Sequence, residues 1–406
     1  MNGQERNPSI DVRGLRKWFP VYKGFFGRHT GDVKAVDGVS FEVAAGETVC
    51  LVGESGSGKS TVARAMLRLV EPTAGEVWIR ARGVSVDFLQ LRLPTGAWRG
   101  PAYVGLFLLL HTAAARVLEF PGELAVNVLG GVLLLAWTCA NAWEASDAAQ
   151  RTRSLREQMQ IVFQDHSESL NPRMSIGEIL GEPLRVHLKL PPVEVEQRVV
   201  ELLAQVGLPE DARARFPHEF SGGQRQRIGI ARALALEPRW VVCDEALSAL
   251  DVSVQAQILN LLADLQRELS LAYLFISHDL AVVRHIADRI HVMYLGRIVE
   301  EGLAADIFER AAHPYTQALL QAIPTTVLPG EGESVVETEK AEVSLGGEVP
   351  SALDPPSGCH YRPRCPFADP RCEVFYPAQV ALSETHRAAC HLLVPDEPAP
   401  ARHSGS

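Results

Sequence analysis

The feature that most constrains this chain is a glycine-rich octapeptide that fits the pattern G-x-x-x-x-G-K-[ST] without a mismatch. Its members are Gly53, Glu54, Ser55, Gly56, Ser57, Gly58, Lys59 and Ser60. A β-prone run precedes it at 47–52, and a segment with helical spacing follows it at 61–70. A strand, a glycine turn and a helix start let backbone N–H groups face phosphate oxygens. The octapeptide therefore predicts an α/β fold with a parallel sheet around a nucleotide site.

The residues at the end of the octapeptide have the chemistry that phosphates and Mg²⁺ require. We expect Lys59 to reach the β- and γ-phosphates, Ser60 to ligate Mg²⁺ and Thr61 to complete the phosphate-binding set. The alternative is a glycine-rich turn with an incidental lysine. The strand and helix signals on either side argue against that alternative.

A second centre follows the apolar run at 240–243, which ends in Asp244 and Glu245. Such a run is typical of a buried parallel strand that presents carboxylates at its C-terminal edge. We expect Asp244 to bind Mg²⁺, mostly through water, and Glu245 to orient or deprotonate the attacking water. An Asp-Glu pair after a strand is a weak motif alone, but it gains weight beside the octapeptide.

Length, charge and the first residues limit the class of protein. The 406 residues are enough for two domains, and 47% hydrophobic with 22% charged residues is typical of a globular chain. The net charge of -10 gives no basic excess, so we expect no nucleic-acid partner. Residues 1–10 have no apolar core behind a positive flank, which predicts a protein that stays in the cytoplasm.

Further motifs resemble those of ABC ATPases and follow in the order of that family. Residues 220–227 (FSGGQRQR) resemble the signature motif, whose usual form begins Leu-Ser-Gly-Gly-Gln, so Phe220 is a departure. Gln164 matches the glutamine of the Q-loop, 248–251 (SALD) matches the D-loop, and His278 matches the switch histidine. The resemblance implies a RecA-like core sheet, an antiparallel β subdomain (9–48 and 75–86) and a helical subdomain that carries Ser221.

The resemblance also implies a role for each motif. The signature residues would contact the γ-phosphate held by a partner subunit, again through donors at a helix start; they are Ser221, Gly222, Gly223 and Gln224. Gln164 would ligate Mg²⁺ and report the nucleotide state to a membrane subunit. His278 would hold the γ-phosphate or the attacking water, and a surface histidine is its alternative. Asp251 would join the nucleotide-binding set.

An aromatic residue near the N-terminus covers adenine in this family. Phe19 is the best match, Trp18 is the second, and packing in the core remains an alternative for both.

The C-terminal part resembles the extension of oligopeptide and dipeptide importer ATPases. The segments 313–320 (HPYTQALL) and 169–173 (SLNPR), and the long stretch at 19–33, carry this likeness. It implies an ATPase subunit that powers peptide import by nucleotide-driven dimer closure. Its partners would be a second, paralogous ATPase subunit, two permease subunits and, indirectly, a substrate-binding protein. We therefore expect a peripheral protein on the cytoplasmic face of the cell membrane. A soluble ABC ATPase without a transport role, and an iron–sulfur-sensing regulatory ATPase, are the alternatives.

Four cysteines in the extension suggest a metal site, because a reducing compartment disfavours disulfides. They are Cys359, Cys365, Cys372 and Cys390. No pair has the tight C-x2-4-C spacing usual for zinc, whereas four cysteines in a loop-rich segment can hold a 4Fe-4S cluster, as some members of the subfamily do. Zinc, with help from His360 or His391, and unmetallated thiols remain alternatives.

The block at 89–150 has no counterpart in the family pattern. Residues 124–143 contain no Asp, Glu, Lys or Arg and are long enough to cross a hydrocarbon core of about 30 Å, whereas 100–115 is uncharged but shorter. We expect an apolar helical hairpin that contacts the membrane through 100–143 or packs on protein, with disorder as a third alternative. The predicted organisation is a nucleotide-binding domain at 1–310 that this block interrupts, a C-terminal domain at 311–394, and a disordered tail at 395–406.

Overall fold

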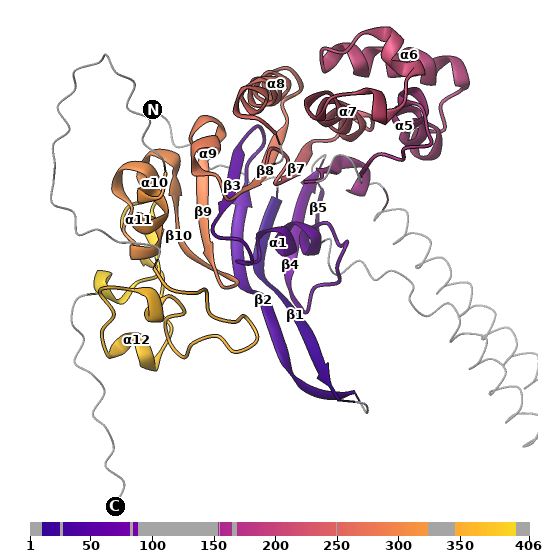
Figure 1. Cartoon of the computed structure of the whole chain (residues 1–406). Coiled ribbons are helices and arrows are strands. Elements are labelled where there is room, and N and C mark those ends of the chain that lie inside the picture. Colours follow the sequence, from indigo (N-terminus) through magenta and orange to yellow (C-terminus); the bar gives the residue numbers. More distant parts are fainter. Residues whose placement is uncertain are drawn as a thin grey trace, which may run out of the picture. The chain divides into compact units, whose positions relative to one another are not determined.

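The computed structural model describes residues 10–24, 27–81, 84–87, 153, 155–164, 169–248, 250–323 and 346–394. The chain divides into two compact units, Met1–Val86 with Glu157–Ser406, and Asp87–Arg156. The elements below belong to the first unit (Figure 1). The predictions for 89–150 and 395–406 fall on residues outside the described part. None of the helices in the described ranges combines the length and the hydropathy that a membrane span needs.

The larger sheet has eight strands in the order β11-β12-β10-β9-β3-β8-β7-β6. Strands β9, β3, β8, β7 and β6 run parallel, and β10, β12 and β11 extend the sheet antiparallel. Their bounds are β3 (Thr48–Val52), β6 (Met159–Val162), β7 (Trp240–Asp244), β8 (Ala272–Ser277), β9 (Arg289–Tyr294), β10 (Arg297–Leu303), β11 (Val380–Ala381) and β12 (Arg387–Ala388). Every residue of β3, β7 and β8 is buried, as expected for strands covered on both faces. This sheet confirms the predicted RecA-like core.

A second, antiparallel sheet has the order β2-β1-β4-β5. It consists of β1 (Ile10–Lys23), β2 (Arg28–Val43), β4 (Ala74–Ala81) and β5 (Val84–Asp87), which matches the subdomain predicted at 9–48 and 75–86. Helix α1 (Lys59–Met66) contacts β1 and β2 on one side and β7 on the other, so it lies between the two sheets (Figure 1).

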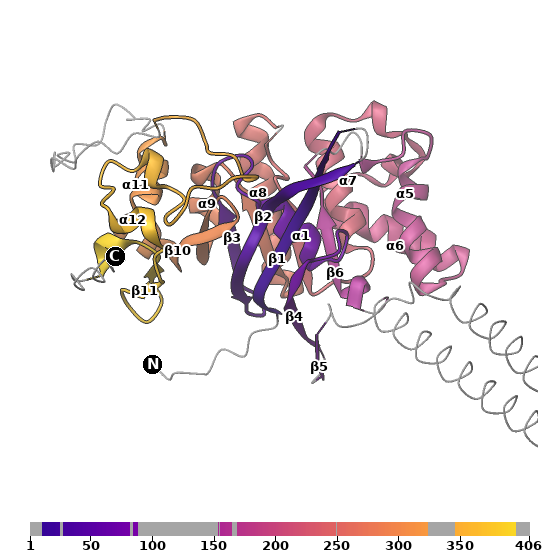
Figure 2. The same cartoon turned by 90° about the horizontal axis from the view of Figure 1, so that it is seen from below.

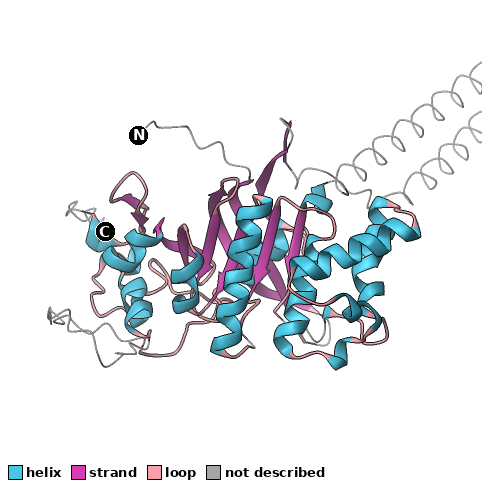
Figure 3. Cartoon of the chain, turned by 90° about the horizontal axis from the view of Figure 1, so that it is seen from above, coloured by secondary structure: helices cyan, strands magenta, loops and turns pink. Residues whose placement is uncertain are grey.

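Helices occupy three regions of the first unit. Helices α5 (Ile176–Pro183), α6 (Pro192–Gln205) and α7 (Gly222–Leu234) contact one another beside β6 (Figure 2). They form the predicted helical subdomain. Helices α8 (Val252–Leu269) and α9 (Leu280–Ile286) are the second group, and α9 packs on β3 and β8. Figure 3 shows helices lying against the strands of the first unit. At the β10 edge lie α10 (Ala304–Arg310), α11 (Pro314–Gln321) and α12 (Arg371–Val374).

The helix after the glycine octapeptide differs in its bounds from the helical segment expected at 61–70. Helix α1 begins at Lys59, directly after Gly58, and it ends at Met66. Arg68 has a left-handed backbone with φ of 56°, which an α-helix cannot continue through. The spacing of apolar residues did not reveal this early end.

Candidate functional site

The glycine octapeptide forms a tight loop between β3 and α1. Gly53 and Gly58 have φ angles of 147° and 104°, which favour glycine. A Cβ atom on Gly53 would lie 2.2 Å from the carbonyl oxygen of Met293, and one on Gly58 would lie 2.0 Å from that of Ala35. The loop therefore needs glycine at both positions because β9 and β2 approach its backbone closely.

Lys59 lies inside this loop with its ammonium group directed at the loop's own oxygen atoms. Its Nζ donates to the carbonyl oxygens of Gly53 (2.7 Å) and Glu54 (2.9 Å), and its side chain is buried. Burial lowers the pKa of Lys59, while the carboxylates of Glu245 and Asp244 act in the opposite direction. An ammonium group in a loop of this kind is a partner for phosphate oxygens.

The predicted magnesium ligands Ser60 and Asp244 lie together. Ser60 Oγ donates to Asp244 Oδ1 at 2.6 Å, and Arg64 Nη2 is 3.9 Å from Asp244 Oδ2. Burial raises the pKa of Asp244, and the bond from Ser60 and the charges of Arg64 and Lys59 oppose this rise. Gln164, the third predicted ligand, is exposed and follows β6, which pairs with β7 at Val162 and Cys243. Gln164 therefore comes just after the C-terminal end of β6, beside the end of β7 that carries Asp244.

Glu245 and His278 are also brought together. His278 Nδ1 lies 3.4 Å from Glu245 Oε2. Both line a small cavity of about 70 Å³. Glu245 has φ of 48°, and its N–H donates to the carbonyl oxygen of Ile276 at 3.0 Å. A non-glycine residue held in the left-handed region is typical of functional sites.

The predicted signature residues form the start of α7. Ser221 is the N-cap: its Oγ accepts from the N–H of Gln224 at 3.4 Å, and Gln224 Oε1 accepts from the N–H of Ser221 at 3.0 Å. This reciprocal capping box orients the first turn. Ser221 is exposed, and Gly222 and Gly223 are half-buried. Asp251 is exposed at the N-cap of α8.

The two aromatic candidates for adenine contact different basic side chains. Phe19 is 38% exposed, and Lys17 Nζ lies 4.7 Å from the centre of its ring. The ring of Trp18 instead meets Lys34 Nζ at 5.2 Å and the guanidinium of Arg16 at 6.0 Å. Neighbouring residues of a strand point to opposite faces, so only one of these rings can stack on a given base.

The four cysteines of the C-terminal extension do not form a site for a single metal ion. Cys359 N–H donates to the carbonyl oxygen of Cys372 at 2.8 Å, and burial raises the pKa of the Cys359 thiol to about 11 and that of Cys390 to about 12. Across the described ranges, no group of three or more His, Cys, Asp or Glu side chains has the geometry to hold a metal ion. His391 Nε2, weighed as a zinc ligand, bonds to the carbonyl oxygen of Phe375 at 3.0 Å instead.

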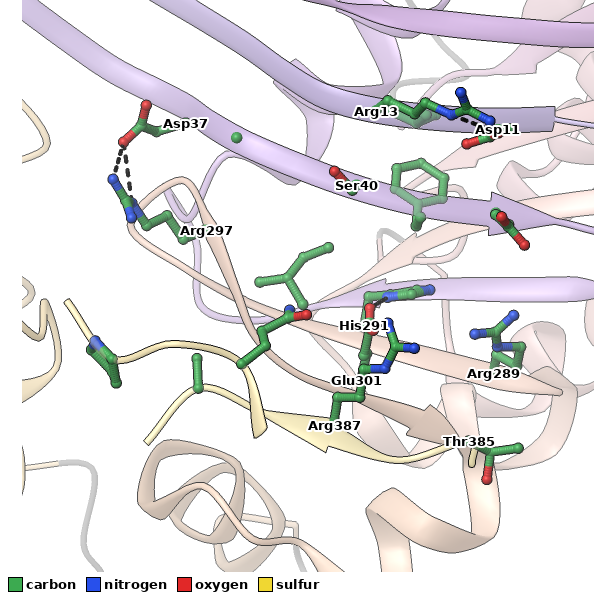
Figure 4. A pocket seen from close by; sticks show the side chains of 18 of the residues that line it. Asp11, Arg13, Asp37, Ser40, Arg289, His291, Arg297, Glu301, Thr385 and Arg387 are labelled. Atoms are coloured by element: carbon green, nitrogen blue, oxygen red, sulfur yellow. Dashed lines mark hydrogen bonds and ion pairs between the residues drawn. The ribbon is translucent and has the colours of Figure 1, made fainter. Parts of the chain in front are cut away.

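A larger cavity of about 540 Å³ lies between the antiparallel sheet and β9, β10 and β12 (Figure 4). Its charged side chains are largely paired. Arg297 holds Asp37 at 2.5 Å, and His291 Nδ1 lies 3.1 Å from Glu301 Oε2. These contacts join the two sheets and their neighbouring strands, and no residue of the glycine loop lines this cavity.

Sequence reasoning missed two neighbours of the glycine loop. Arg364 Nη1 lies 2.6 Å from Glu54 Oε2, and the Tyr315 hydroxyl accepts from the N–H of Glu54 at 2.8 Å. Both residues belong to the C-terminal extension, and no short motif links either of them to the octapeptide.

A phosphate loop, a strand that ends in Asp-Glu and a facing histidine together define a P-loop ATPase. Two family models match the chain: "Oligopeptide/dipeptide transporter, C-terminal region" at 299–372, and "ABC transporter" at 36–95 and 136–248. The oligopeptide transport ATP-binding protein AppF of Bacillus subtilis is 40% identical, over 97% of this chain and 99% of the relative. The dipeptide transport ATP-binding protein DppF of Haemophilus influenzae is 41% identical, over 95% and 97%.

Solved structures agree with this fold. CbiO1 of Clostridium perfringens, part of an ABC transporter complex, aligns with a TM-score of 0.50 and 23% identity over 75% of this chain and 92% of its own. The ATP-binding cassette MJ0796, bound to ADP and phosphate, aligns with a TM-score of 0.50 and 22% identity over 73% and 98%. On the strength of the sequence matches, the chain belongs to the ATP-binding subunits of the oligopeptide/dipeptide ABC transporters.

Proposed function

We propose that this chain is the ATPase subunit that powers import of oligopeptides or dipeptides through a membrane permease. The observation that carries the proposal is the extent of the similarity. Relatives named as oligopeptide and dipeptide transport ATP-binding proteins match over almost the whole chain, including the C-terminal region that other ABC ATPases need not share. The fold alone supports only ATP binding, because ABC ATPases serve several processes.

The glycine loop would bind the phosphates of ATP, and Phe19 or Trp18 would cover the adenine. Lys59 already directs its ammonium at oxygen atoms within the loop, and phosphate oxygens would replace those carbonyl partners. Ser60 and Asp244 offer two oxygen atoms 2.6 Å apart, a donor set that suits Mg²⁺, and Gln164 would complete it. Mg²⁺ held by these residues would neutralise negative charge that develops on the phosphates.

Hydrolysis would depend on Glu245 and His278. Glu245 would accept a proton from the attacking water or orient it, because its carboxylate lies at the C-terminal edge of the sheet, one residue beyond the magnesium ligand Asp244. His278, 3.4 Å from that carboxylate, would hold the water or the γ-phosphate in place. The left-handed backbone of Glu245 fixes the direction from which the carboxylate acts.

The second half of the nucleotide site would come from a partner ATPase subunit. Ser221 is exposed at the start of α7 while its capping box keeps that helix turn in shape. Such a helix start can donate N–H groups to the γ-phosphate of the partner. Closure of two subunits around two nucleotides, with Asp251 near the shared interface, would drive the permease pair. We propose that the partner ATPase is a paralogue and that a substrate-binding protein interacts with this chain only indirectly, through the permease. We also propose that the chain lies on the cytoplasmic face of the membrane.

The cysteines are proposed to hold an iron–sulfur cluster instead of a single ion. Cluster irons are spread over a larger volume than one zinc ion, which needs all four sulfurs within about 2.3 Å of one point. Beyond the effect of burial, Cys372 and Cys365 raise the pKa of the Cys359 thiol, and Cys359, Cys365 and Cys372 raise that of the Cys390 thiol, which supports a common neighbourhood for the four. Iron and acid-labile sulfide analysis of protein purified without oxygen tests this. Absence of both would leave four unmetallated thiols, of which Cys372 and Cys390 are buried and Cys359 and Cys365 half-buried.

The transport proposal is tested by purifying the tagged chain from membranes of its own cell and identifying bound subunits. We expect two permease subunits and a second ATPase, together with peptide-dependent stimulation of hydrolysis after reconstitution in lipid. Recovery with ribosomes or nucleic acid and no permease would instead support a soluble ABC ATPase.

A further inference from the structure

The glycine loop at 53–60, from here on the P-loop, is contacted by the C-terminal segment, which we define as residues 346–394. We propose that Arg364 of this segment is a positioning residue of the nucleotide site, acting through Glu54. The inference rests on the proposed phosphate-binding role of the P-loop. It assigns to the C-terminal segment an indirect part in ATP binding, through Glu54.

The contact is a two-pronged ion pair. Arg364 Nη1 lies 2.6 Å from Glu54 Oε2, and Nη2 lies 2.9 Å from Glu54 Oε1. The Arg364 side chain is 3% exposed and that of Glu54 is 22% exposed. Paired N–H groups that meet both carboxylate oxygens give strong and directional bonds, and little solvent is present to weaken them.

Two tyrosines, which pack on a third, lie beside the guanidinium of Arg364. Its central carbon lies 5.9 Å from the ring centres of Tyr294 and of Tyr361. The rings of Tyr294, Tyr315 and Tyr361 pack on one another with centres 4.7 to 5.3 Å apart. Arg364 Nε also donates to the carbonyl oxygen of Gly346 at 3.0 Å. These contacts therefore help to orient the Arg364 guanidinium independently of its ion pair with Glu54.

Glu54 in turn connects this support to the phosphate-binding atoms. Its carboxylate binds Arg364, its N–H donates to the Tyr315 hydroxyl, and its carbonyl oxygen accepts from Lys59 Nζ at 2.9 Å. The same carbonyl oxygen accepts from the N–H of Ser57 at 3.2 Å, which closes the turn of the loop. A shift of Glu54 would therefore move both the turn and the ammonium group.

Charge gives a second reason for the pair. The carboxylate of Glu54 belongs to a loop that binds the most negative part of ATP. Without a cation beside it, that carboxylate would repel the phosphates at short range. Arg364 cancels the charge, so its removal should weaken nucleotide binding, and removal of the Glu54 charge as well should restore part of the affinity.

The experiment measures binding of Mg²⁺-ADP by calorimetry, and kcat and KM for ATP, on the full chain. Arg364→Ala should raise Kd and KM about tenfold, with a smaller change in kcat. Arg364→Ala combined with Glu54→Gln should recover a large part of that loss. Arg362→Ala is the matched control, since Arg362 lies in the same short turn but pairs with Glu373 at 3.2 Å. It should bind nucleotide as the wild type does.

Wild-type affinity in Arg364→Ala, or no recovery in the double variant, would overturn the proposal. If Arg364→Ala does not fold, Arg364→Lys decides, because it keeps the charge and loses the fork. We expect about a threefold weaker affinity for it, and unchanged affinity would be contrary evidence. Lys59→Ala distinguishes failure of the Arg364 proposal from failure of the proposed phosphate site. If Lys59→Ala still binds nucleotide normally, the proposed phosphate site itself is wrong.

Discussion

His313 is buried and makes the stability of the C-terminal part depend on pH. It is 2% exposed, and burial lowers its pKa to about 3. Its Nδ1 accepts from the N–H of Tyr315 at 3.0 Å at the start of α11, so the neutral ring serves as the helix cap. The backbone N–H of His313 donates to Glu300 Oε2 at 3.0 Å. Protonation would remove the cap and place a charge in the core.

Proton linkage gives the direction and size of the change in the free energy of unfolding with pH. In the unfolded chain a histidine has a pKa of about 6.5 and takes up a proton as the pH falls, whereas folded His313 stays neutral down to a pH of about 3. The unfolded state therefore gains stability as the pH falls from about 7 to about 5. This one group should lower the free energy of unfolding by about 2 kcal/mol over that interval.

The assay compares urea unfolding of the full chain at the two pH values with that of His313→Asn. Asparagine can accept the same N–H as a helix cap but does not titrate. His360, whose pKa is lowered to about 4, and all other groups are common to both proteins. The wild type should lose about 2 kcal/mol more than the variant between the two pH values. Equal losses in both proteins would show that His313 does not cause the pH dependence.

Three further substitutions, and Gly229→Ala as a control, test the nucleotide site and the elements that support it. Lys59→Ala should lower the ATPase rate about 100-fold or more in a steady-state assay, since phosphates lose their buried cation. Gly58→Ala places a Cβ 2.0 Å from the carbonyl oxygen of Ala35 and should lower the free energy of unfolding by about 2 kcal/mol or more, whereas Gly229→Ala, with open space in α7, should be neutral or stabilising. Ser221→Ala should cost about 1 kcal/mol through its lost cap, and should also slow hydrolysis at saturating ATP.

The sequence was informative where the chemistry is local. The loop from Gly53 to Ser60, the strand that ends in Asp244 and the cap at Ser221 are each encoded within about ten residues. The positions of the first two followed from strand, turn and helix signals, whereas the helix start at Ser221 followed from the resemblance of 220–227 to the ABC signature motif; the structure has all three elements at those places. Within this fold the sheet order then brings Ser60 and Asp244 together, although they are 184 positions apart.

The contacts of the C-terminal segment could not be predicted in the same way. Arg364 and Glu54 are 310 positions apart, and an arginine beside a cysteine gives no signal that its partner lies in the P-loop. The spacing of the four cysteines indicated a candidate metal site in this segment, but it did not predict where their sulfur atoms lie relative to one another. The early end of α1 depends on the left-handed backbone of Arg68, which a pattern of apolar residues does not report.

We propose that Glu245 acts in hydrolysis and not in ATP binding. The most direct test is Glu245→Gln, with ATP affinity, single-turnover rate and subunit association measured on the same preparation with its partner ATPase. We expect near-normal ATP affinity, a turnover rate lower by about 100-fold or more and an ATP-bound dimer that persists. Hydrolysis at the wild-type rate in this variant would contradict it.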